Sequence, residues 1–110
     1  MEKNTLGNIE EKIRSNEILN SEKKSELLGL IEKLKKEISE LSESKAEHAE
    51  SIVGFMERTT HETTRKQKNQ KLVDLSIDGL SASVKEFEVS HPKLVEYVNN
   101  ISSMLANMGI

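Results

Sequence analysis

The chain has 110 residues, of which only 35% are apolar, against roughly 45–50% in an ordinary globular domain, and 32% are charged. Its net charge of −3 gives no general attraction to nucleic acid or to an anionic membrane, and the absence of cysteine excludes disulfides and thiolate chemistry. No apolar run approaches the roughly 18 residues that cross a bilayer, and the first residues lack the apolar core of a secretory signal. We therefore expect a single cytoplasmic domain, residues 1–110, that does not enter a membrane.

The N-terminal half predicts a short helix followed by a long one. Residues 5–15 place apolar side chains on one helical face, at Leu6, Ile9 and Ile13. Residues 21–58 then predict one long helix, because apolar residues recur at alternating intervals of four and three, the a/d pattern of a helix that packs against other helices. These residues are Leu27, Ile31, Leu34, Ile38 and Leu41, and the same phase continues to Ile52 and Phe55.

The stretch from Thr59 to Lys71 interrupts this pattern. It contains four threonines, which are poor helix formers, and no strongly apolar residue. We interpret residues 65–71 as a solvated turn, and the sequence leaves open whether residues 59–71 as a whole are helix or loop.

Two further helices are predicted over residues 71–89 and 92–108. They repeat the four–three spacing at Val73, Ile77, Leu80, Val84 and Phe87 and again at Leu94, Val98, Ile101, Leu105 and Met108. Ser90, His91 and Pro92 mark the bend between them, because proline suits the first position of a helix and the residues before it can act as the cap. Gly109 is the expected left-handed residue that ends the last helix.

These stripes predict an all-α fold, a coiled-coil-like bundle or helical hairpin. In it, the third and fourth helices fold back along the long second helix. Because each stripe is narrow, we expect self-association into a dimer or tetramer, so that the protein acts as a structural or protein-interaction module. We call the following residues the seam: Leu27, Ile31, Leu34, Ile38, Leu41, Ile52, Phe55, Val73, Ile77, Leu80, Val84, Phe87, Leu94, Val98, Ile101, Leu105 and Met108.

The end of the chain, from Phe87 to Ile110, resembles the C-terminal signature of a small bacterial family catalogued as domain of unknown function 4404. The resemblance is carried by residues 72–110, and more loosely by residues 5–42. Its matching residues are Phe87, Glu88, His91, Pro92, Leu94, Ile101, Leu105, Met108, Gly109 and Ile110. It implies a small helical protein and no particular activity, cofactor or partner.

Two groups of residues indicate alternatives to an interaction module. The basic residues Arg65, Lys66, Lys68 and Lys71 could bind nucleic acid or an anionic surface, but no aromatic side chains are interleaved for base stacking, which disfavours nucleic acid. Glu88 and His91 have the Glu-x-x-His spacing of di-iron bundles, yet the chain holds only one copy, so a metal site would need two chains and a structural cap is favoured.

The remaining histidines and the possible nucleophiles of the sequence indicate no further function. His48 falls in phase with the seam, where it could titrate between pH 5 and 8, although a partly exposed packing role is favoured. The sequence has no glycine-rich phosphate loop and no nucleophile elbow, and we expect neither enzyme activity nor a cofactor.

Overall fold

The computed structural model describes the backbone of residues 2–17 and 19–108, and the side chains of residues 5–17 and 19–107. Its α-helices are α1 (Glu2–Arg14), α2 (Ser21–Ser39), α3 (Glu43–Thr64), α4 (Gln70–Ser83) and α5 (Pro92–Met108), with one 3-10 turn, η1 (Lys85–Phe87). The described residues contain no β-strand, so the predicted all-α class is confirmed.

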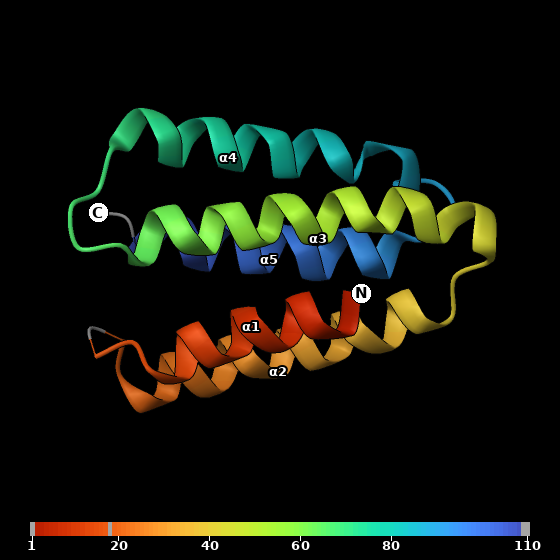
Figure 1. Cartoon of the computed structure of the whole chain (residues 1–110). Coiled ribbons are helices and arrows are strands. Elements are labelled where there is room, and N and C mark those ends of the chain that lie inside the picture. The colour runs from red at the N-terminus through yellow and green to blue at the C-terminus, as the bar shows by residue number, and fades with distance from the viewer. Residues whose placement is uncertain (1, 18, 109–110) are drawn as a thin grey trace.

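The helices form a bundle in which α1, α3 and α5 run in one direction and α2 and α4 in the other (Figure 1). Four of them surround a common core: α1 packs on α2 and α3, and α5 packs on the same two helices. The remaining helix, α4, lies outside these four and packs on α3 and α5. The prediction that the last two helices lie along the second is therefore wrong for α4, which pairs with α3 instead.

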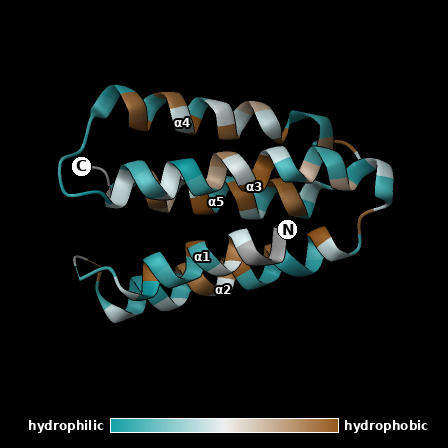
Figure 2. Ribbon diagram, viewed as in Figure 1, coloured by the Kyte–Doolittle hydropathy of each residue, from teal (hydrophilic) through white to brown (hydrophobic). Residues whose placement is uncertain are grey.

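The core consists of the apolar stripes of all five helices. Figure 2 shows hydrophobic positions recurring between hydrophilic ones along the helices. The radius of gyration is 13.1 Å, as expected for a compact chain of this length. Buried apolar residues are Leu6, Ile9, Ile13, Leu27, Ile31, Leu34, Ile38, Ala49, Ile52, Val53, Met56, Val73, Leu80, Val84, Phe87, Leu94, Val98, Ile101 and Leu105. The narrow apolar stripes do not need a second chain for their burial, because helices of the same molecule enclose them.

The predicted long helix over residues 21–58 is in fact two helices. It breaks after Ser39, where the N–H groups of Glu40 and Leu41 close a tight last turn, and Ser42 takes an extended N-cap conformation before α3. An unbroken helix would be about 57 Å long, far beyond the 37 Å length of the bundle. The break lets α3 turn back and pack its own stripe on the core.

The break also changes which residues of α3 are buried. Ala49, Val53 and Met56 enter the core together with Ile52, whereas His48 and Phe55, which continue the phase of α2, are exposed by 48% and 41%. Phe55 was therefore wrongly predicted as a buried seam residue. Leu41 and Ile77 are only partly buried. Gly109 and the side chain of Met108 lie outside the described residues.

The threonine-rich end of α3 is helical to Thr64, so the helix continues past the predicted end at residue 58. Its buried hydroxyl groups donate to carbonyl oxygens one turn earlier, as in Thr59 to Phe55 at 2.8 Å and Thr60 to Met56 at 2.8 Å. Since these hydrogen bonds satisfy each hydroxyl inside the helix, the methyl groups can pack and tertiary contacts outweigh the poor propensity of threonine. The predicted turn is shorter, with α4 starting at Gln70. The predicted helix over 71–89 instead ends at Ser83 and is followed by η1.

Candidate interaction surface

Most of the large exposed apolar side chains in the described residues belong to the α3–α4 hairpin. Among the described residues, the large apolar side chains with substantial exposure are Phe55 (41%), Leu72 (39%), Leu75 (56%) and Val89 (97%). Val89 lies in the turn before α5, but the other three belong to the α3–α4 hairpin. Exposed apolar side chains that lie next to one another are candidates for a binding surface, whereas singly scattered ones are ordinary.

The helical spacing explains why these residues share a surface. On both helices a second stripe, separate from the core stripe, recurs at intervals of three and four residues. We call this surface the α3–α4 face: His48, Ser51, Phe55 and Arg58 on α3, and Leu72, Leu75, Gly79, Ala82 and Glu86 on or directly after α4. Leu72 and Leu75 lie at the start of α4 but belong to this outer stripe and not to the core. The spacing alone does not separate them from the core stripe, because both stripes have the same period.

A shallow groove of about 270 Å³ runs along the α3–α4 face. Its floor is formed by small residues, including Gly79, Ala82 and Ser83, and Phe55 closes one side. The Phe55 ring lies directly over Gly79, where an added Cβ would be 2.5 Å from its Cδ1 atom. A side chain at this position would displace the ring, so glycine allows Phe55 to pack directly on α4.

The two ends of the α3–α4 face differ in charge. At one end, His48 Nδ1 lies 2.9 Å from Glu86 Oε2, and both side chains are about half exposed. At the other end are Arg58, the turn between α3 and α4, and Lys71. The first end thus carries the Glu86 carboxylate beside His48, and the second carries the cationic side chains of Arg58 and Lys71.

A buried carboxylate stabilises the end with the cationic side chains. Glu62 is 2% exposed and accepts hydrogen bonds from Arg58 and Arg65, each at 3.1 Å. Burial raises the pKa of Glu62, but the hydrogen bonds from Arg65 and Arg58 outweigh that effect and leave the pKa below its ordinary value. Arg65, one of the four predicted basic-cluster residues, is consequently engaged within the protein. Nucleic-acid binding by this cluster stays a prediction.

A second buried charge lies between α1 and α2. Glu10 is 4% exposed and accepts a hydrogen bond from Lys35, which also contacts Glu32 at 3.2 Å. The hydrogen bond with Glu10 raises the pKa of Lys35 and keeps its ammonium group charged. Within the described residues, Glu10 Oε2 has no hydrogen-bond partner. The hydrophobic pattern of α1 gave no sign of this buried ion pair.

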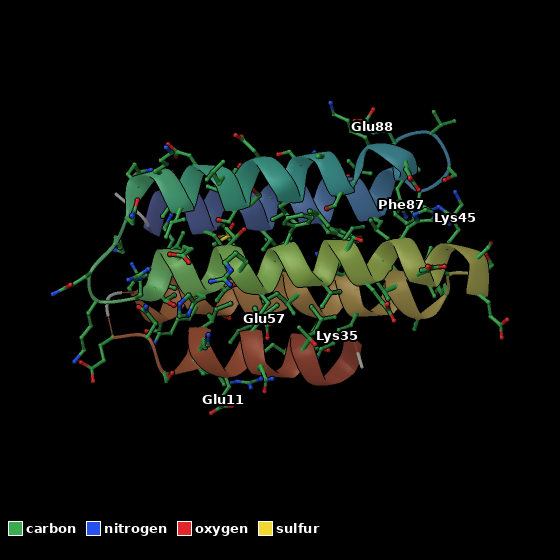
Figure 3. All side chains as sticks on the ribbon, turned by 45° about the horizontal axis from the view of Figure 1, so that its top comes forward. Glu11, Lys35, Lys45, Glu57, Phe87 and Glu88 are labelled. Carbon is green, nitrogen blue, oxygen red and sulfur yellow. The ribbon has the colours of Figure 1, made fainter. Side chains whose placement is uncertain are left out.

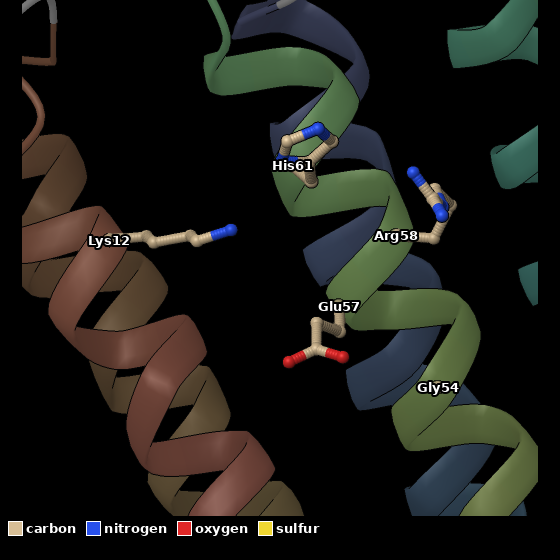
Figure 4. A pocket seen from close by; sticks show the side chains of 5 residues that line it. All are labelled: Lys12, Gly54, Glu57, Arg58 and His61. Atoms are coloured by element: carbon tan, nitrogen blue, oxygen red, sulfur yellow. The ribbon is translucent and has the colours of Figure 1, made fainter.

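A polar cleft of about 380 Å³ lies between α1 and α3 (Figure 4). Lys12 reaches across from α1, the Glu57 carboxylate points into the gap, and Arg58 points away from it (Figure 4). His61 and Gly54 complete the lining. Charges of both signs line the cleft, and they do not converge on one point, so the cleft selects no particular ligand.

The residues between η1 and α5 form a compact bend. The His91 ring packs edge-on against Phe87 with ring centroids 5.6 Å apart, and its Nδ1 lies 2.9 Å from Ser90 Oγ. The His91 carbonyl accepts from the Val95 N–H at 3.3 Å, and Pro92 begins α5. These contacts are consistent with the predicted role of His91 as part of the cap before α5.

The two residues of the Glu-x-x-His pair differ in exposure, because His91 is half-buried and Glu88 is exposed. Glu88 is exposed on the outer side of the bend, away from Phe87 and Lys45 (Figure 3). No three His, Asp or Glu residues in the part of the chain described by the structure are grouped to hold a metal ion. The metal-binding alternative therefore gains no support from this geometry.

The fold and its surface define the class of protein: a small all-α bundle with an apolar face on one helical hairpin. The chain belongs to the family described as domain of unknown function (DUF4404), which it matches over residues 30–110. This match runs from within α2 through α5 and confirms the family resemblance of the C-terminal segment. No curated protein and no solved structure matches the chain. Among the described residues, none of the helices is long and apolar enough to cross a bilayer.

Proposed function

We propose that this protein is a non-catalytic protein-interaction module that associates with itself through the α3–α4 face. The observation that carries the proposal is the exposure of Phe55, Leu72 and Leu75 on one helical hairpin, where Phe55 packs on Gly79 and the two leucines precede Gly79 at helical spacing on α4. The seam cannot serve this purpose, because most of its side chains are already enclosed in the core and would become available only if the bundle opened.

The size of the exposed apolar area sets the expected strength. The exposed portions of the three side chains amount to about 250 Å² per copy, so a dimer would bury about 500 Å² of apolar surface, worth about 12 kcal/mol before the costs of association. Losses of rotational, translational and side-chain freedom offset most of that gain. We therefore expect a weak dimer with a Kd of about 1–100 μM, and not an obligate one.

Light scattering from wild-type protein tests this function, at concentrations from about 1 μM to about 1 mM. The mass should rise from monomer to dimer over this range, and Leu75→Gln should shift the transition at least tenfold upward because it removes the most exposed leucine of the face. Val89→Gln is the matched control, since Val89 is more exposed and lies in the turn after η1, outside both helices of the hairpin. A mass that stays monomeric, or association that Leu75→Gln leaves unchanged, would refute the proposal.

A further inference from the structure

We infer that the partner on the α3–α4 face is a second copy in antiparallel orientation, related by a two-fold axis that crosses the hairpin near Gly79. This inference rests on the proposed function and adds the orientation and the residue pairs. The axis lies in the interface and runs across the helices, so that α4 of one copy lies over α4 of the other with reversed direction.

Shape complementarity fixes the register. Leu75 projects from the first half of α4 and is 56% exposed, whereas the second half carries the small residues Ala82 and Ser83 in the groove. In an antiparallel pair centred between residues 78 and 79, position 75 of one copy lies opposite position 82 of the other. Each Leu75 thus enters the groove of the opposite copy, as a knob does in a hole between helices.

Charge complementarity leads to the same centre. Lys71 and Glu86 are also equally far in sequence from the point between residues 78 and 79. Because Glu86 lies in η1, just beyond the end of α4, the antiparallel arrangement brings Lys71 of each copy near the His48–Glu86 pair of the other. In the parallel alternative, the Lys71 side chains would face one another and so would the Glu86 carboxylates, which is repulsive. Two different pairs, one apolar and one ionic, therefore share one symmetry centre.

The available area agrees with a weak dimer. A hairpin section about 25–30 Å long and about 20 Å wide offers about 500–600 Å² per copy. Stable interfaces bury about 800 Å² per partner, so this contact belongs at the weak end of specific association. It extends over most of the 37 Å length of the bundle, which leaves little room for another register.

Charge reversal at the two paired positions provides the test. Lys71→Glu and Glu86→Lys should each raise the homodimer Kd about tenfold in low salt, because either change places like charges opposite one another twice per dimer. An equimolar mixture of the two variants should form a heterodimer with a Kd near that of the wild type, since every opposed pair is again of unlike sign. The rescue should weaken in about 0.5 M salt. Unfolding followed by circular dichroism verifies that each variant is folded.

The outcomes separate the inference from the function on which it rests. Association that depends on Leu75 but is unchanged, or strengthened, by the single charge reversals overturns the antiparallel register and leaves the interaction face intact. Weakening by both reversals without heterodimer rescue also overturns the paired register. A wild-type protein that stays monomeric removes both the function and the inference. Only the combination of Leu75 dependence, weakened single variants and a rescued mixture supports the antiparallel dimer.

Discussion

Truncation of Leu34 to alanine measures whether the core belongs to one chain. Leu34 lies on the buried face of α2 and is fully enclosed. Removing its terminal carbons forfeits their burial and leaves a cavity, at a cost of about 3 kcal/mol in the free energy of unfolding. A 110-residue domain has an unfolding entropy of about 0.23 kcal/mol/K, so the melting temperature should fall by about 13 °C. Leu75→Ala, the same change at a half-exposed position, should cost less than about 1 kcal/mol.

Thermal unfolding followed by circular dichroism gives these values, and its dependence on concentration separates the two possible origins of the core. For a core contained in one chain, the melting temperature of the Leu75→Gln variant, in which surface association is weakened, should not change with concentration. For a core shared between two chains, a tenfold increase in concentration would raise it by about 3 °C. Such a rise, or a Leu34→Ala penalty below about 1 kcal/mol, would refute the single-chain core.

Three further predictions concern polar groups. Because the pKa of Glu62 is lowered in the folded state, its contribution to stability is present at neutral pH and is lost as the pH falls below about 4.5. Glu62→Gln should therefore cost about 1–2 kcal/mol in the free energy of unfolding at pH 7 and almost nothing near pH 3. Equal penalties at both pH values in urea titrations would contradict this. Lys35→Met should cost about 1–3 kcal/mol in the free energy of unfolding at pH 7, because it leaves the buried Glu10 carboxylate without its ammonium partner. Since the pKa of Lys35 is raised, the stabilisation by this ion pair should persist at neutral pH and fade only above about pH 10.5. Unchanged stability of the variant at pH 7 would argue against the ion pair. Asn20→Ala should cost about 1 kcal/mol in the free energy of unfolding, since the Asn20 side chain accepts a hydrogen bond from the Lys23 N–H at 2.8 Å. Ser42→Ala should cost almost nothing, because the Ser42 hydroxyl makes no cap hydrogen bond. Equal melting temperatures for the two variants would count against this difference.

The sequence predicted the elements whose apolar period was strong and continuous. Leu6, Ile9 and Ile13 in α1 and the stripe of α5 from Leu94 to Leu105 are buried as their spacing indicated. In these helices a single apolar face packs on the core, so periodicity alone identifies the buried residues. The N-cap of α2 is Asn20, and a side-chain acceptor directly before an apolar run is a local feature of the sequence.

The break at Ser42 could not be predicted from the same periodicity. The four–three spacing runs from Leu27 through His48 to Phe55 without a change of phase, so nothing in the pattern marks the end of α2. Tertiary packing determines the break. The residues of α3 that face the core, Ala49, Val53 and Met56, are shifted by one position from those that continue the phase of α2. Likewise the buried threonines become acceptable only once their hydroxyl groups bond within the helix.

The candidate surface follows from that same shift. Once α3 presents Met56 and Ile52 to the core, Phe55 is turned toward α4 and can rest on Gly79, and the outer stripe of α4 is left without a covering helix. A pattern read along one chain cannot distinguish an apolar stripe that meets the core from a second stripe that meets solvent, because both have the same period. The two differ only in whether a neighbouring helix lies over them, and on α4 the neighbours α3 and α5 both lie on the side of Leu80 and not on the side of Leu75.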